Sequence, residues 1–264
     1  MTTPIIDIHA HIWPEALAPK AVFNLAQFYR FPADGEGTAA ALLQEMDRSG
    51  VAVAVLHNVA MRPEQVTKLN DWIATQRSER FVCFAAMHPD HPDPRGELTR
   101  CARELGLKGM KIHSDFQQVN LDDPRMMPLY EAMEELGLPV ILHMGDPRMD
   151  FSAPERLLPV LKRFPKLTVI AAHFGGYGVW ERAACLYGHP QVYLDTSSAL
   201  WALPTQQAYD IIQAHGAQRV LFGSDYPVVH GYVAELHRFD LLPLTQEERR
   251  LILHDNAATL LGLE

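Results

Sequence analysis

Cysteine and long apolar runs are scarce in this sequence of 264 residues. Its three cysteines are odd in number and have no C-x-x-C spacing, so we expect free thiols, as in a reducing cytoplasm, at Cys83, Cys101 and Cys185. No apolar run reaches the roughly 18 residues of a membrane-spanning helix. The first residues also lack the basic and apolar regions of a signal peptide. We therefore expect a cytoplasmic protein without a membrane partner.

An excess of basic charge and two familiar turn motifs are also absent. The formal net charge of −9 argues against a nucleic-acid partner, because such proteins need a basic patch. The first apolar run leads into Ile12-Trp13-Pro14 rather than a glycine-rich phosphate turn, which disfavours an open, doubly wound sheet. No Gly-x-Ser-x-Gly elbow occurs, which disfavours a serine hydrolase. A small molecule is the partner that we expect.

What the sequence does contain is a regular alternation of strand and helix patterns. Its composition, 48% hydrophobic and 21% charged, is ordinary for a globular protein. Short apolar runs, rich in β-branched residues, lie at 4–11, 51–57, 81–87, 108–113, 139–143, 167–173, 191–196 and 219–225. Helical patterns separate them, as at 63–78, 93–105, 124–136 and 154–164. This alternation predicts βαβ units and a parallel sheet, and the chain length suits a single-domain (β/α)8 TIM barrel over 1–264.

Two connections, 12–37 and 226–245, are longer than the rest and rich in aromatic residues. The segment 12–37 follows the first strand, so in a barrel this insertion lies at the C-terminal face. We expect it to form a lid, a pocket wall or the contact of a homodimer. Trp13 is its aromatic residue nearest the strand end and is the candidate for contact with substrate.

Histidine and other polar residues collect where the predicted strands end. His9 and His11 are two residues apart on a strand, so their side chains point to the same face. The carboxyl ends of parallel strands meet on one face of a barrel, where active sites form. The strand-end residues are His9, His11, His57, His88, Lys111, His113, His143, His173 and Asp225, and we expect His57 and His88 to line the pocket or lie in loops.

These residue types are those that bind a catalytic metal. Such a metal needs three or more nitrogen or oxygen ligands and an open position. We predict that His9, His11, His143 and Asp225 provide them, a set that suits Zn²⁺ and also Mn²⁺ or Fe²⁺. His173 is left to bind a second ion or to act as a general acid or base.

Several of these motifs together resemble the amidohydrolase superfamily, in particular its amidohydrolase-related branch, which includes aminocarboxymuconate-semialdehyde decarboxylase-like proteins. They are Asp7-x-His9-x-His11 and the segments 109–113, 142–145, 172–175, 223–227 and 255–263. The resemblance covers nearly the whole chain. It implies a distorted (β/α)8 barrel with one or two divalent metal ions at its C-terminal face.

The resemblance also implies roles for single residues. His9 and His11 match the ligands of strand one, and His143 matches that of strand five. Asp225 matches an acid that binds metal or handles the proton of water. His173 matches a proton shuttle in mononuclear members and a metal ligand in binuclear ones. Lys111 falls where some binuclear members have a carboxylated lysine, so the number of ions stays open.

Three functions fit these features. The first is hydrolysis of a small amide, ester or lactone, with Asp225 accepting the proton of a metal-activated water and His173 assisting. The second is non-oxidative decarboxylation, in which Arg148 or Lys111 would hold the carboxylate of the substrate. The third is a metal-free, ligand-binding barrel. His113 shares a strand face with Lys111, and both are candidates for substrate contact.

Overall fold

Parallel strands form the framework of the protein in the computed structural model, which describes residues 4–30, 35–228 and 231–263. Each of the eight apolar runs contains a strand, and the run 81–87 is split into β3 (Phe81–Cys83) and β4 (Ala85–Ala86). The chain divides into two compact units, and β3 begins in the first and ends in the second. The first unit holds Met1–Leu56, Ser78–Phe81 and Thr196–Glu264, and the second holds His57–Arg77 and Val82–Asp195.

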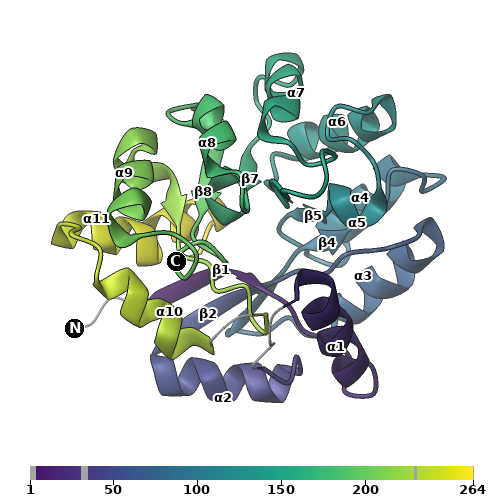
Figure 1. Cartoon of the computed structure of the whole chain (residues 1–264). Coiled ribbons are helices and arrows are strands. Elements are labelled where there is room, and N and C mark those ends of the chain that lie inside the picture. Colours follow the sequence, from purple (N-terminus) through teal and green to yellow (C-terminus); the bar gives the residue numbers. More distant parts are fainter. Residues whose placement is uncertain (1–3, 31–34, 229–230, 264) are drawn as a thin grey trace. The chain divides into compact units, whose positions relative to one another are not determined.

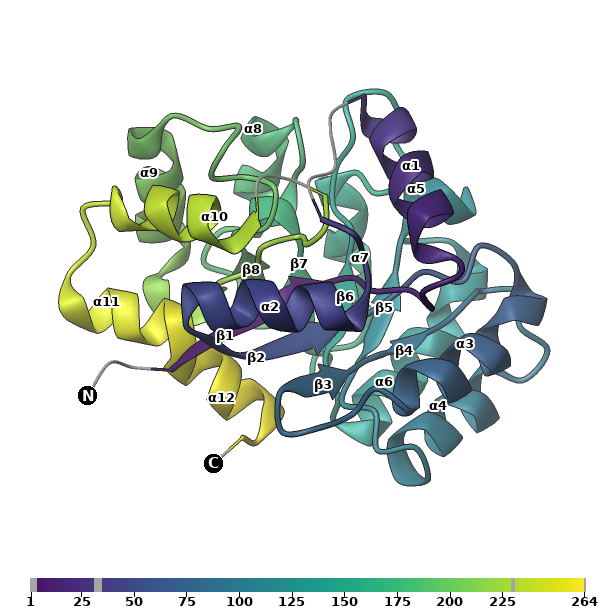
Figure 2. The same cartoon turned by 90° about the horizontal axis from the view of Figure 1, so that it is seen from below.

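The first unit is built around β1 (Ile5–Ala10). On one side β1 pairs in parallel with β2 (Val51–Leu56). On its other side Ile8 donates a hydrogen bond to the carbonyl of Phe222, 2.9 Å away, just beyond β9 (Val220–Leu221). Figure 2 shows α2 lying along these strands. The helices are α1 (Ala18–Tyr29), α2 (Ala39–Ser49), α9 (Thr205–His215), α10 (Gly231–Asp240), α11 (Gln246–Arg250) and α12 (Asn256–Leu261).

The second unit contains a parallel sheet with strands in sequence order. Its strands are β4, β5 (Met110–Ile112), β6 (Val140–Leu142), β7 (Val169–Ala171) and β8 (Val192–Asp195). Strands β5, β6 and β7 are buried at every position, as expected for a parallel sheet covered on both faces. Figure 1 shows the helices that alternate with them, which are α3 (Val66–Ala74), α4 (Pro94–Arg103), α5 (Ser114–Gln117), α6 (Met127–Leu136), α7 (Leu157–Arg163) and α8 (Trp180–Ala183).

Local sequence signals set the ends of these helices. Asp93 caps α4, because its side chain accepts a hydrogen bond from the N–H of Gly96 at 2.9 Å. Pro94 occupies the first turn of α4, where no helical N–H partner is lost. Gly137 ends α6 with a φ of 65°, a conformation that costs glycine little. The predicted alternation of strands and helices is thus confirmed.

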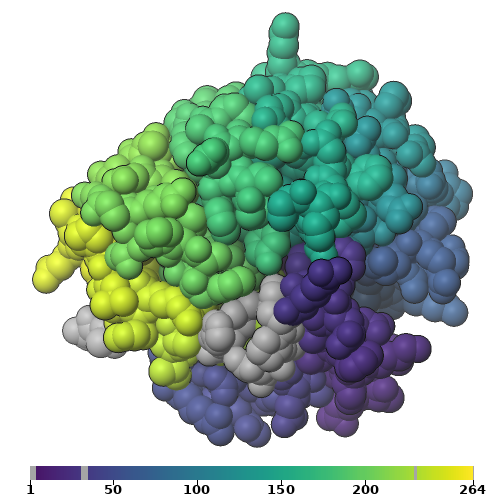
Figure 3. Space-filling view, viewed as in Figure 1, coloured from purple at the N-terminus to yellow at the C-terminus, as the bar shows by residue number. Residues whose placement is uncertain are grey.

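The predicted insertion 12–37 contains a helix. Residues 18–29 form α1, while residues 31–34 lie outside the described part of the chain. In Figure 3, α1 (purple) lies at the surface, and the side chain of Phe23 is 62% exposed. A role of this segment as lid or dimer contact stays a prediction, as does the single domain over 1–264. Among the described residues, no helix is long and apolar enough to cross a membrane.

Candidate metal centre and histidine pair

In the first unit, two histidines meet one carboxylate. His9 lies in β1 and His11 directly follows it, and their Nε2 atoms lie 3.3 and 3.2 Å from Oδ1 of Asp225. Asp225 has a φ of 63°, a left-handed conformation that Asp tolerates better than most residues. Its N–H donates to the carbonyl of His9 at 2.8 Å. The turn after β9 is therefore fastened to β1 at the point where the carboxylate faces the imidazoles.

Asp7 joins the three elements around this cluster. Its carboxylate accepts hydrogen bonds from the N–H of His9 (2.8 Å), the N–H and hydroxyl of Ser224 (3.0 and 2.6 Å) and the hydroxyl of Tyr232 (2.6 Å). Burial raises the pKa of Asp7 to about 7, although these hydrogen bonds favour the ionised form. Asp7 therefore connects β1, the turn after β9 and α10.

Two serines hold the cluster from the segment after β8. The hydroxyl of Ser198 donates to Oδ2 of Asp225 at 2.5 Å, which leaves Oδ1 to the imidazoles. The hydroxyl of Ser197 lies 3.0 Å from Nδ1 of His9. When Nδ1–H donates to this hydroxyl, the lone pair of His9 is on Nε2, beside Asp225. Metal-binding histidines are typically oriented by such a bond to their other nitrogen. The donor set therefore fits a divalent metal ion.

In the second unit, two histidines face each other. His143 follows β6 and His173 follows β7, and Nε2 of His173 lies 3.0 Å from Nδ1 of His143. Nε2 of His143 lies 3.0 Å from the carbonyl oxygen of Gly145, which can only accept a hydrogen bond. In the neutral ring the proton of His143 is therefore on Nε2. Its Nδ1 carries a lone pair, which can accept the Nε2–H of His173 or face a cation.

Backbone and aromatic contacts fix this histidine pair. His173 has a φ of 60°, unusual for a residue other than glycine, and its N–H donates to Oδ1 of Asp195 at 3.0 Å. The indole of Trp180 donates to the carbonyl of His173 at 2.9 Å. The ring of Tyr177 lies 5.8 Å from that of His173 and 6.3 Å from that of His143. Backbone strain of this kind is often found at functional sites.

A second possible ligand cluster, formed by His113, Asp115 and His143, is a poor metal site. The rings of His113 and His143 are stacked, with centroids 3.8 Å apart and planes within 10° of parallel. A metal ion lies in the plane of each imidazole that binds it, about 2.1 Å from the nitrogen. Two nearly parallel planes at this separation cannot both contain one ion. The stack, which Phe116 continues on the far side of His113, instead fixes the ring plane of His143.

The structure constrains the predicted substrate-binding residues without testing their role. Lys111 lies in β5 and is buried. Arg148 forms a two-fold ion pair with buried Asp146, at 2.9 and 2.6 Å, which balances its charge. Nδ1 of His113 accepts the N–H of Phe116 at 3.4 Å. The ring of Trp13 lies 6.2 Å from that of His11. Contact of all four residues with substrate stays a prediction.

Sequence reasoning did not identify several residues that support the cluster. Tyr232 and Ser224 bind Asp7, and Ser198 binds Asp225. Ser197 and Ser198 carried a weak signal, because they follow a predicted strand. Tyr232 lies in the long connection 226–245, but nothing in the sequence singled it out among the aromatic residues there. Its hydroxyl can donate a hydrogen bond to Asp7 only because the tertiary fold brings the two residues together.

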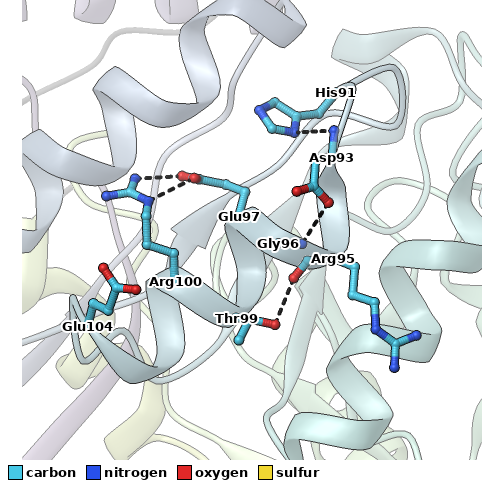
Figure 4. A pocket seen from close by; sticks show the side chains of 8 residues that line it. All are labelled: His91, Asp93, Arg95, Gly96, Glu97, Thr99, Arg100 and Glu104. Carbon is cyan, nitrogen blue, oxygen red and sulfur yellow. Dashed lines mark hydrogen bonds and ion pairs between the residues drawn. The ribbon is translucent and has the colours of Figure 1, made fainter.

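A hollow on the outer side of α4 carries no comparable chemistry. It has a volume of about 630 Å³ and lies among charged side chains of α4 and the turn before it (Figure 4). Arg100 is paired with Glu97 and Asp71, and Asp93 already caps the helix. These charges are balanced locally, so the two histidine clusters remain the candidate sites.

Comparison with known proteins identifies the family. The family described as "Amidohydrolase" matches residues 6–263. The 2-amino-3-carboxymuconate-6-semialdehyde decarboxylase of Dictyostelium discoideum is 26% identical over 84% of this chain and 76% of the relative. The gamma-resorcylate decarboxylase of Rhodococcus jostii (strain RHA1) is 26% identical over 75% of this chain and 76% of the relative. The resemblance predicted from the motifs is thus confirmed, as is the prediction of an enzyme.

Solved structures show the same fold. An uncharacterised TIM-barrel protein of Bordetella bronchiseptica aligns with a TM-score of 0.78 and 25% identity over 98% of this chain and 99% of the other. A dihydroxybenzoic acid decarboxylase of Polaromonas sp. JS666 with bound manganese aligns with a TM-score of 0.76 and 21% identity over 99% of this chain and 98% of the other. The predicted α/β fold class of the TIM barrel is confirmed by these likenesses.

Proposed function

We propose that this chain, which belongs to the amidohydrolase family, is a divalent-metal-dependent, non-oxidative decarboxylase of a small, unsaturated or aromatic carboxylic acid. The observation that carries the proposal is the meeting of His9 and His11 at one carboxylate oxygen of Asp225, in a chain whose relatives are named as decarboxylases. The relatives therefore support the second of the three predicted functions better than the hydrolysis placed first.

The first unit supplies the donors for the metal. His9 and His11 would bind it through Nε2 and Asp225 through Oδ1, since these atoms converge. When bound, a divalent ion would hold the substrate and draw electron density from it. The manganese in a structural neighbour makes Mn²⁺ as reasonable a choice as the predicted Zn²⁺. That His143 completes the ligand set, and that Lys111 is carboxylated beside a second ion, stay predictions.

The reaction is balanced without an oxidant. The bond between the substrate carbon and its carboxylate breaks, CO₂ leaves, and the electron pair stays on the carbon, which takes up one proton. We propose that His173, as an imidazolium, supplies this proton from Nε2, the nitrogen that faces Nδ1 of His143, and becomes neutral, after which solvent returns the proton. Because a neutral His143 accepts at Nδ1, it can keep the ring of His173 oriented while the proton is held.

The carboxylate of the substrate needs a partner as well. Arg148 is already neutralised by Asp146, so its contribution to binding would be small while that pair is intact. Lys111 stays a candidate for this role. Tyr177, half-buried beside both histidine rings, offers an aromatic edge to a planar acid.

The test is to measure several products in parallel. Protein loaded with Mn²⁺ or Zn²⁺ is incubated with a panel of hydroxybenzoates, unsaturated dicarboxylic acids, amides, esters and lactones. We expect CO₂ from at least one acid and no acid release from the amides, esters or lactones. Acid release without CO₂ would favour the hydrolase, and binding without turnover or metal dependence would favour the ligand-binding barrel.

A further inference from the structure

We propose that Ser152 and Asp115 are positioning residues, which fix the tautomer of His143 by holding the carbonyl of Gly145 against its ring. The inference deepens the proposed function, on which it rests only for the assignment of His143 to the active site. These residues lie in the second unit, in the loop after β6 and in α5.

Ser152, in the loop after β6, makes one contact with α5 and one with Gly145 in its own loop. Its hydroxyl donates a short hydrogen bond to Oδ2 of Asp115, and its carbonyl accepts the N–H of Gly145 at 2.9 Å. Ser152 and Asp115 are both buried, so water does not replace these bonds readily. The position of Gly145 therefore depends on a side-chain contact made seven residues later in the chain.

Gly145 is also fixed by close packing. It has a φ of +76°, and a Cβ atom at this position would lie 2.7 Å from the carbonyl carbon of Gly176 and from Cγ2 of Val179. Such distances are far below ordinary van der Waals contact, so only glycine brings the loop this close. The direction of the Gly145 carbonyl is thus set by the packing on one side and by Ser152 on the other.

This carbonyl determines where the proton of His143 resides. Nε2 of His143 has two acceptors near it, the oxygen of Gly145 at 3.0 Å and Oδ2 of Asp115 at 3.8 Å. Both favour a proton on Nε2, so that Nδ1 faces Nε2 of His173 as an acceptor. If the carbonyl turned away, the proton could move to Nδ1. The N–H groups of His143 and His173 would then point at each other, and no hydrogen bond could join the two rings.

The consequence is a specific kinetic defect. The contact acts on the orientation of the histidine pair and not on the substrate, so its loss should lower kcat and leave KM nearly unchanged. Substitution of such supporting residues typically reduces activity or metal affinity by about 10–100-fold. We expect Ser152→Ala to fall in this range. Ser152→Thr, which keeps the hydroxyl, should restore part of the loss.

The direct test is the nitrogen spectrum of the His143 ring. The full chain is labelled with ¹⁵N-histidine and studied both loaded with Zn²⁺ and after chelation, and a His143→Gln variant identifies the signals. We expect a protonated Nε2 in the wild type, and a mixture of the two tautomers after chelation in Ser152→Ala. An unchanged Nε2–H signal in Ser152→Ala would overturn the proposal.

Matched variants separate this role from simple loss of a buried hydroxyl. Ser114 is buried next to Asp115, and among the described residues no hydrogen-bond partner reaches its hydroxyl. Ser114→Ala should therefore leave the spectrum and kcat as they are. Should Ser152→Ala not fold, Asp115→Ala must shift the tautomer while Asp115→Asn, which can still accept the serine hydroxyl, does not. Equal spectra in Asp115→Ala and Asp115→Asn would also overturn the proposal.

The tautomer measurement and the reaction assay test the two proposals separately. A wild-type chain with protonated Nε2 but without CO₂ release on any acid would refute the decarboxylase and leave the positioning contact in place. Release of CO₂ together with an unaffected tautomer in Ser152→Ala would support the decarboxylase and refute the positioning contact.

Discussion

The two units hold their histidines by different means. In the first, hydroxyl and carboxylate side chains surround His9, whose ring lies between Ser197 and Asp225. In the second, His143 is held by a backbone carbonyl and by the stacked ring of His113. A carboxylate beside two imidazoles attracts a cation, whereas carbonyl and ring contacts favour neutral imidazoles in a fixed tautomer. The difference supports the proposal that the first unit binds metal and the second delivers a proton.

Removal of a ligand from the first unit should have the largest effect. We expect His9→Ala to lose both bound metal and activity, with a fall larger than the roughly 10–100-fold cost of a supporting residue. Metal per chain is measured by mass spectrometry and turnover by CO₂ release. His237→Ala, an exposed histidine of α10 in the same unit, is the control. Full metal content and normal turnover in His9→Ala would end the metal assignment.

Substitution in the second unit should separate rate from metal. We expect His173→Asn to keep at least one ion and to lose about 10²–10⁴-fold in kcat, because general acids contribute effects of this size. His237→Asn should behave as the wild type. Loss of one of two metal equivalents would instead assign His173 to a binuclear centre, and an unchanged rate would remove it from the mechanism.

A buried acid near the first cluster should make stability depend on pH. Burial raises the pKa of Glu235 from 4.5 to about 7, and among residues 4–30, 35–228 and 231–263 its Oε2 has no hydrogen-bond partner. The folded state thus binds more protons than the unfolded state between these values, so the free energy of unfolding falls as pH rises through them. Glu235→Gln should remove the contribution of Glu235 and leave that of Asp7, whose pKa burial also raises to about 7.

The expected difference between wild type and Glu235→Gln grows from pH 5 to pH 8 by about 1–3 kcal/mol, since one pKa unit corresponds to about 1.4 kcal/mol. Urea denaturation at several pH values measures it. Exposed Glu247 lies in the same unit, and Glu247→Gln should keep the slope of the wild type. Parallel pH curves for all three proteins would show that Glu235 ionises as freely when folded as when unfolded.

The smallest effect is expected at the rim of the first cluster. Trp13→Ala should raise KM about tenfold, a change of about 1.4 kcal/mol, and leave the metal bound. The reason is the position of its ring, 6.2 Å from that of His11. The KM of Trp13→Phe should lie between that of the wild type and that of Trp13→Ala. If KM stayed constant for every substrate, Trp13 would only pack against its own loop.

The strands could be predicted because each is a short apolar run that ends in a polar residue or, for 81–87, is directly followed by one. The residues of the two clusters were found for the same reason, since His9, His143 and Asp225 stand at or just beyond strand ends. The helix α1 was missed as an element because its aromatic residues were attributed to a loop insertion, although Pro19 in its first turn is a helix-start signal.

The contacts that support the clusters could not be predicted. Tyr232 reaches Asp7 across 225 positions of sequence, and Ser152 reaches Asp115 across 37. Neither pair has a spacing that a helix or strand would impose. The carbonyl of Gly145 is a further case, because a backbone oxygen leaves no mark on the residue type except the requirement for glycine.

The most direct test of the central claim is decarboxylation in D₂O with metal-loaded and chelated protein. An accepted acid should release one CO₂ and give a product with one deuterium at the carbon that carried the carboxylate, only when metal is bound. His173→Asn should give the same labelled product more slowly. Products that contain an added oxygen from water, or equal turnover after chelation, would contradict the assignment of metal binding to the first unit and proton delivery to the second.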